Sequence, residues 1–142
     1  MVTKLDHIGV AVEGLAQALK PYQEGLGITP SAIEEVADQG VRIAFLPVGD
    51  SEIELLEPTS PDSPVARFLE KRGEGLHHIC LEVDDLEATL SRLKAQGVRL
   101  IDETPRPGGQ GKRIAFVHPH GLHGVLLELA QRVDLDPKDH SS

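Results

Sequence analysis

The sequence predicts an α+β fold in which two βαβββ modules form one curved, barrel-like mixed sheet with helices on its outside. Residues 6–12 (Asp-His-Ile-Gly-Val-Ala-Val) line up with residues 77–83 (His-His-Ile-Cys-Leu-Glu-Val), and residues 42–45 (Arg-Ile-Ala-Phe) recur at the same offset as residues 113–116. Two matches in one register indicate an internal duplication. Because 142 residues suit one domain and are too few for two independent cores, the copies are expected to be halves of one structure.

The charge balance and the cysteine count exclude some classes of function. The chain has 14 Lys and Arg against 23 Asp and Glu, a formal net charge of -9, and no basic stripe that could neutralise nucleic-acid phosphates. The single cysteine, Cys80, cannot form an intrachain disulfide, so nothing indicates an oxidising compartment. No signal segment or membrane-length apolar run is visible. We therefore expect a cytoplasmic protein without nucleic-acid or membrane partners.

The first predicted module spans about residues 4–57. Alternation over residues 4–12 predicts a strand, with Ile8 and the residues in phase with it on one face and His7, Gly9 and Ala11 on the other. Apolar spacing over residues 15–26 predicts an amphipathic helix that covers the apolar face of the sheet and ends at the nearby glycines. Three further strands are predicted at residues 31–36, 41–48 and 52–57, with a tight turn at 49–50.

A link and a short helix separate the modules. Residues 58–63 read as the link, and Ser63 is the expected N-cap of a helix that begins at Pro64 and stops at Gly73. The second module, about residues 75–130, begins with a strand at 75–83. A helix capped by Asp84, with Glu87 completing a capping-box variant, is expected to run to Gly97.

The rest of the second module is expected to repeat the first. Residues 100–103 are a short strand candidate, residues 105–111 form a loop, and strands are predicted at 113–116 and 125–129. The domain is expected to span residues 1–132, followed by a polar and disordered tail at 133–142.

The duplication predicts a metal site. It pairs His7 with His78 and Glu54 with Glu128 on equivalent strands, and a curved sheet would turn all four toward its concave side. Two neutral imidazoles and two carboxylates suit a divalent metal at roughly 2.0 to 2.2 Å, with cobalt or manganese favoured and nickel, zinc or iron as alternatives. A cation also offsets the repulsion between two buried carboxylates.

Other polar residues receive structural interpretations. His77 is out of phase with His78 and is expected to face the helix layer or cap a loop, whereas Cys80 is expected to be a small cavity-lining residue rather than a nucleophile. Three further histidines, at positions 118, 120 and 123, lie in a predicted hairpin connection and are expected to be surface residues. The glycine-rich segment at residues 108–113 resembles a phosphate loop only superficially. A Walker sequence would need glycine in place of Arg106 and Ser or Thr in place of Arg113, so nucleotide hydrolysis is rejected. A lid or plain loop is expected, with Arg106, Lys112 and Arg113 available to an acyl carrier's phosphates.

Five motifs stand out, at residues 6–10, 53–58, 75–79, 118–119 and 124–129. Together they resemble the vicinal oxygen chelate superfamily and, within it, the methylmalonyl-CoA epimerase family, and the likeness covers residues 4–131. The resemblance implies a glyoxalase/bleomycin-resistance-like fold, an acyl-CoA substrate and a homodimer. It also implies R/S interconversion at C2 of methylmalonyl-CoA through an enolate, on a metal held by His7, Glu54, His78 and Glu128.

The resemblance also implies that Glu128 is catalytic, since the matching family residue both binds metal and transfers a proton. Inversion needs a second acid/base on the opposite face of the planar intermediate. Some family members carry a glutamate where Ile43 stands here, so that role does not carry over. Glu57, Glu35 and a metal-bound water remain the alternatives.

Three other functions compete with the epimerase. Glyoxalase I resembles the chain in ligand type, fold and size, but usually builds each site from two subunits. A ligand-sequestering resistance protein would use an aromatic pocket, and this chain has only three Phe, one Tyr and no Trp. An extradiol dioxygenase would use two His and one carboxylate and is usually a larger two-module chain.

Overall fold

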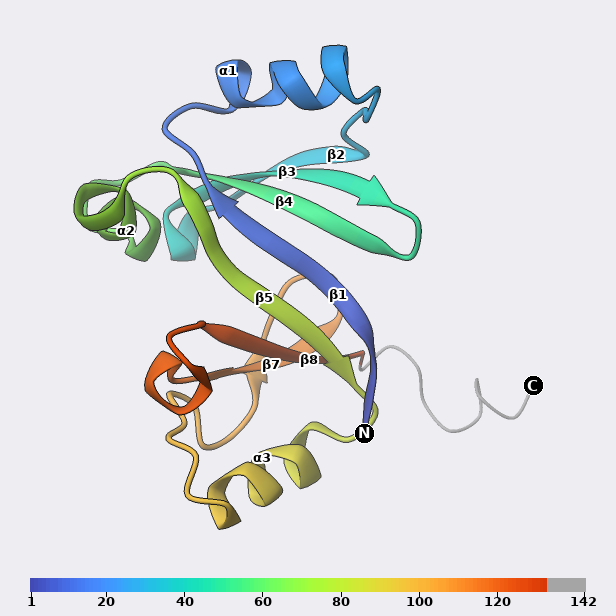
Figure 1. The fold of residues 1–142 in the computed structure, drawn as a ribbon, viewed down its shortest axis with the longest axis vertical. Coiled ribbons are helices and arrows are strands. Elements are labelled where there is room, and N and C mark those ends of the chain that lie inside the picture. Colours follow the sequence, from blue (N-terminus) through green and yellow to red (C-terminus); the bar gives the residue numbers. More distant parts are fainter. Residues whose placement is uncertain (133–142) are drawn as a thin grey trace. The chain divides into compact units, whose positions relative to one another are not determined.

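The computed structural model describes residues 1–132 of the chain (Figure 1), so the predicted disordered tail at 133–142 lies outside the described residues. The described residues form two compact units. One comprises His7–His78, and the other comprises Met1–Asp6 together with residues 79–132. Two strands, β1 (Val2–Ala11) and β5 (Gly75–Val83), contribute residues to both units.

The His7–His78 unit is built on a mixed sheet with the strand order β2-β3-β4-β1. Its other strands are β2 (Ala32–Val36), β3 (Val41–Val48) and β4 (Ser51–Pro58), and a short 3-10 turn, η2 (Ala37–Gln39), joins β2 to β3. Neighbours β2, β3 and β4 pair antiparallel, whereas β1 runs parallel to β4. Glu54 on β4 is flanked in register by Gly9 of β1 and Phe45 of β3.

The predicted helix at residues 15–26 is present but changes its pitch. It comprises α1 (Leu15–Lys20) and a π-helical turn, η1 (Pro21–Gly25). Pro21 has no N–H to donate to the preceding turn, and its carbonyl accepts the bond from Leu26 N five residues later, at 3.0 Å. Leu15 and Leu19 pack against a buried face of β3 and β4, as the apolar stripe predicts; that face comprises Ala44, Leu46 and Leu55.

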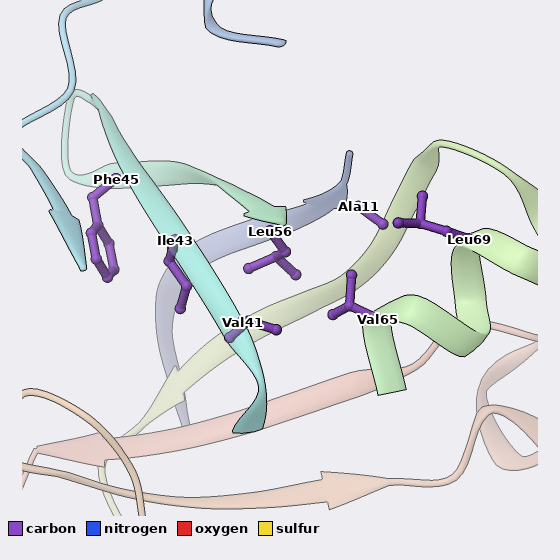
Figure 2. Close-up of a cluster of buried hydrophobic side chains, with 7 residues drawn as sticks. All are labelled: Ala11, Val41, Ile43, Phe45, Leu56, Val65 and Leu69. Carbon is purple, nitrogen blue, oxygen red and sulfur yellow. The ribbon is translucent and has the colours of Figure 1, made fainter. Parts of the chain in front are cut away.

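A second helix, α2 (Pro64–Arg72), covers the opposite face of β3. Its Ser63 cap is confirmed, because the Ser63 side chain accepts the Ala66 N–H at 3.1 Å, and Gly73 ends the helix with a φ of 75°. Figure 2 shows the cluster that this helix closes, with Val65 and Leu69 beside the strand residues Ala11, Val41, Ile43, Phe45 and Leu56. These positions alternate with the ones that α1 contacts.

The other unit repeats this plan with the strand order β5-β8-β7-β6. After β5 come α3 (Leu86–Ala95), β6 (Arg106–Pro107), β7 (Lys112–Val117), the 3-10 turn η3 (Pro119–Leu122) and β8 (Leu127–Arg132). Strand β5 pairs parallel with β8, and the remaining pairs are antiparallel. Helix α3 lies beside β7 and β8 (Figure 1) and packs Leu86 and Leu90 against them. The predicted α+β fold with two βαβββ modules is confirmed.

Three boundaries in this unit differ from the prediction. Residues 100–103 are not a strand, since only Leu100 forms a bridge, with Val117. The Asp102 carboxylate accepts the Phe116 N–H at 2.8 Å and so takes the place of a ladder bond. The last strand starts at Leu127 instead of Val125, because Val125 N donates to Leu122 O and still belongs to the turn.

The third difference concerns the start of α3. Asp85 is its N-cap and accepts the Ala88 N–H at 3.0 Å, whereas the predicted cap, Asp84, binds the amino group of Met1 at 2.5 Å. A cap must precede the first helical residue directly, and the chain turns one residue later than the sequence indicates. No helix within residues 1–132 is long and apolar enough to cross a membrane.

Candidate active site

Three of the predicted metal ligands meet inside the His7–His78 unit. Nε2 of His7 lies 3.0 Å from Nε2 of His78, and Nδ1 of His7 lies 3.2 Å from a carboxylate oxygen of Glu54. All three residues are buried, and the two imidazole rings are perpendicular, with an interplanar angle of 89°. Three strands, β1, β4 and β5, therefore place two imidazole rings and one carboxylate next to one another.

Gly9 makes this arrangement possible. It lies between His7 and Ala11 on the same face of β1, and a Cβ built on it would sit 2.3 Å from Cε1 and 2.6 Å from Nδ1 of His78. Its backbone φ is ordinary, so the requirement is for space and not for a left-handed conformation. The missing side chain at Gly9 therefore leaves room for the His78 ring.

The three side chains fit a divalent metal. Their ligand atoms all lie within 4.8 Å of one another. Two nitrogens bound to one metal at about 2.0–2.1 Å in tetrahedral or octahedral geometry are roughly 3 Å apart, which matches the separation of the two Nε2 atoms. Neutral imidazoles and a carboxylate are ligands that zinc, cobalt, manganese, nickel and iron accept. The donor set is therefore a possible metal centre.

The fourth predicted ligand, Glu128, belongs to the other unit. It lies on β8 between the buried residues Leu127 and Leu129, and in register with Cys80 of β5 and Phe116 of β7. Its membership of the ligand set stays a prediction. Cys80 is fully buried beside Ile114 and Ala130, so within its own unit it is a core residue.

Sequence reasoning missed the contact that His77 makes. Its Nδ1 lies 2.9 Å from Nδ1 of His78, and its ring makes an edge contact with Phe68 of α2 at a centroid distance of 5.0 Å. The period-two pattern assigned His77 to the opposite face, and the Phe68 contact agrees with a position beside the helix layer. The only sign of this contact in the sequence is that two histidines are adjacent at positions 77 and 78.

The alternatives for the second acid/base have other partners. Glu57 accepts the Leu15 N–H at the start of α1 and lies 3.2 Å from Arg42, and Glu35 also pairs with Arg42 at 3.4 Å. Glu57 alternates with Glu54 along β4, so it faces the α1 side of the sheet. Ile43 is buried in the cluster of Figure 2 and packs as a core residue.

The basic residues around the loop at 105–111 are paired with carboxylates. Lys112 contacts the buried Asp6 at 3.0 Å, Arg113 contacts Glu87 at 2.9 Å, and Arg106 contacts Asp102 at 3.3 Å. In the turn that follows, His120 and His123 are exposed, as predicted. His118 Nδ1 accepts the His120 N–H, and partial desolvation and the nearby Arg99 lower the pKa of His118.

Comparison with known proteins defines the class. Residues 6–116 match the Glyoxalase/Bleomycin resistance protein/Dioxygenase superfamily. The chain belongs to this superfamily, and its two βαβββ modules and its cluster of histidine and glutamate agree with that membership. The resemblance noted from the motifs is confirmed.

Within the superfamily, relatives named as epimerases resemble nearly the whole chain. The ethylmalonyl-CoA/methylmalonyl-CoA epimerase of Cereibacter sphaeroides is 40% identical over 133 residues, which are 92% of this chain and 99% of the relative. A variant of the Streptomyces coelicolor methylmalonyl-CoA epimerase, solved with 2-nitronate-propionyl-CoA, has a TM-score of 0.86 and 38% identity over 96% of this chain and 99% of that one. The uncharacterized protein YqjC of Bacillus subtilis is 45% identical over 130 residues, 92% of this chain and 93% of the relative.

Proposed function

We propose that the chain is a methylmalonyl-CoA epimerase that interconverts the R and S forms at C2 through an enolate. The observation that carries the proposal is the buried group of His7, Glu54 and His78, in a chain whose relatives at 38–40% identity are named as epimerases of this substrate. The α-proton of a thioester with a second carbonyl group is acidic enough for removal by a positioned carboxylate once the resulting charge is stabilised.

The residues supply binding and proton transfer. A divalent cation, when bound, would act as a Lewis acid that stabilises negative charge on the substrate's carbonyl oxygens. His7, Glu54 and His78 would hold it, and we include Glu128 as the fourth ligand. Strand alternation supports this, because β5 places Cys80 in phase with His78 and Glu128 is the register partner of Cys80.

Glu128 is also the proposed acid/base that moves the proton at C2. The nitronate in the Streptomyces coelicolor complex is a planar anion, as is an enolate, which supports a binding site in this family that favours such a charge. Glu57 and Glu35 are unsuited to the second acid/base role, since one caps α1 and both pair with Arg42.

Four finer properties belong to the same proposal. We propose cobalt or manganese as the metal. Nickel, zinc and iron are alternatives, because they also accept nitrogen and carboxylate ligands. The acyl-CoA substrate follows from the relatives' names. A homodimer and a cytoplasmic location are proposed from the family resemblance and the cysteine usage. A single domain over residues 1–132 is proposed from the duplicated plan.

The decisive experiment is solvent-deuterium incorporation at C2 of methylmalonyl-CoA, with the purified protein before and after treatment with a chelator. We expect rapid exchange that the chelator abolishes and added cobalt restores. Isomerisation of the methylglyoxal–glutathione adduct without exchange at C2 would replace the epimerase with a glyoxalase. Exchange that survives complete removal of metal would contradict the role given to His7, Glu54 and His78.

A further inference from the structure

We propose that His77 is a positioning residue for the candidate metal centre. Its imidazole would accept the Nδ1 proton of His78, and this would leave the lone pair of His78 on Nε2, the atom that faces Nε2 of His7 and would bind the metal. The inference rests on the proposed metal centre and adds a residue outside the four predicted ligands. It follows from a row of contacts within the His7–His78 unit that runs from Glu54 through His7 and His78 to His77.

The separation of the two Nε2 atoms identifies the ligand atom of His7. Nε2 of His7 lies 3.0 Å from Nε2 of His78, which matches two nitrogens bound to one metal. With Nε2 as the ligand atom, the proton of a neutral His7 is on Nδ1, which lies 3.2 Å from the Glu54 carboxylate. Glu54 would then have to turn from Nδ1 toward Nε2 of His7 in order to bind the same metal.

The tautomer of His78 follows from the need for a second lone pair. A neutral imidazole has one N–H and one lone pair, and a metal ligand must present the lone pair. If Nε2 of His78 is to bind, its proton must be on Nδ1, which lies 2.9 Å from Nδ1 of His77. His77 must then be the acceptor. Ligating histidines commonly donate their second N–H to such a partner, which fixes the ring and raises its basicity.

The packing of His77 supports a specific orientation. Neighbouring residues of a strand direct their side chains to opposite faces, so two successive histidines ordinarily keep their rings apart. Here the rings of His77 and His78 are 5.1 Å apart and nearly perpendicular. Phe68 contacts the His77 ring, and the Arg72 guanidinium lies 5.8 Å from the Phe68 ring centroid. Helix α2 therefore packs against His77 through Phe68.

Two substitutions separate hydrogen bonding from packing. His77→Phe keeps an aromatic ring against Phe68 but removes the acceptor, whereas His77→Asn loses the ring and keeps an oxygen close to the position of Nδ1. His120→Phe is the matched control, because His120 is an exposed histidine in η3. Thermal unfolding of the metal-free variants shows whether each one folds.

The first measurement is the affinity for Co²⁺, by calorimetric titration of the full chain. We expect His77→Phe to weaken binding about 10- to 100-fold, the usual effect of losing such a partner, and His77→Asn to recover most of that loss. His120→Phe should bind like the unsubstituted protein. The second measurement is nitrogen-detected NMR of the Zn²⁺-loaded protein, in which His78 should carry its proton on Nδ1.

The outcomes distinguish this inference from the proposed function. Equal Co²⁺ affinity in His77→Phe and the unsubstituted protein would overturn the role of His77 while leaving the metal centre intact. Equal weakening in His77→Phe and His77→Asn would also overturn it, because packing alone would then explain the loss. An unsubstituted protein that binds neither Co²⁺ nor Zn²⁺ would instead refute the metal centre itself.

Discussion

At the scale of single residues, the His78 ring lies so close to Gly9 that position 9 has no room for a side chain. The imidazole of His78 lies where any side chain at position 9 would begin. A close-packed site of this kind transmits small changes, because protein interiors hold few voids into which a displaced ring can move. We therefore expect Gly9 to affect the candidate metal centre without being one of its ligands.

Gly9→Ala is expected to displace the His78 ring and weaken Co²⁺ binding at least tenfold, with a cost of about 1–3 kcal/mol in the free energy of unfolding from overpacking. Gly14→Ala is the control, because nothing lies within 4 Å of a Cβ at that position. Metal titration and urea unfolding measure the two effects. Unchanged metal affinity in Gly9→Ala would show that the ring has another place to go.

His78→Ala is expected to abolish both the metal content and the activity while the fold is largely retained. The helices and the apolar clusters do not include His78, so the core stays intact. Elemental analysis and circular dichroism of the purified variant test this, with His120→Ala as the comparison. Full metal occupancy in His78→Ala would remove His78 from the ligand set.

Glu128→Gln is expected to slow α-proton exchange more than it weakens substrate binding. The amide keeps the size of the side chain but cannot take up the proton. Deuterium exchange at C2 and the apparent substrate affinity are measured on the same preparation. Losses of equal size in both would indicate that Glu128 has a structural role only.

At the scale of elements, a side-chain hydrogen bond lies at the start of each of the helices α1, α2 and α3. Ser63 caps α2 and Asp85 caps α3, and Glu57 of β4 accepts the first N–H of α1. Each bond satisfies one of the N–H groups that a helix leaves unpaired at its start. Helix α2, which Ser63 caps, carries the Phe68 ring that contacts His77.

Asp85→Ala is expected to lower the free energy of unfolding by about 1 kcal/mol, the usual cost of losing an aspartate N-cap. Asp84→Ala is the matched control one residue earlier, where the carboxylate is exposed and binds the Met1 amino group instead. Its effect should be smaller and should decrease with added salt. A larger loss in Asp84→Ala would restore the cap that the sequence favoured.

At the scale of the whole molecule, metal binding is expected to raise stability, because the three ligands come from β1, β4 and β5, far apart in sequence. A ligand that binds only the folded state at 100 times its Kd stabilises that state by about 2.7 kcal/mol, or roughly 8 °C in Tm for a chain of this size. Differential scanning calorimetry with Co²⁺ measures the shift. His78→Ala should show none, and a shift of equal size in that variant would locate the metal elsewhere.

The sequence by itself determined the duplicated plan and the strand faces. Two matches at one offset predict two βαβββ modules, and period two places His7 and Gly9 on one face, because side chains alternate along a strand whatever packs against them. Helix caps were less predictable, since Asp84 and Asp85 are chemically equal candidates.

Only the tertiary structure decided which residues approach one another. The 3.0 Å separation of His7 and His78, the ring that fills the space beside Gly9 and the partners of His77 depend on how strands from distant parts of the chain lie in register. The same holds for the contacts of Glu57 with Leu15 N of α1 and with Arg42. Local sequence sets a side chain's face, whereas the pairing of strands sets its neighbours.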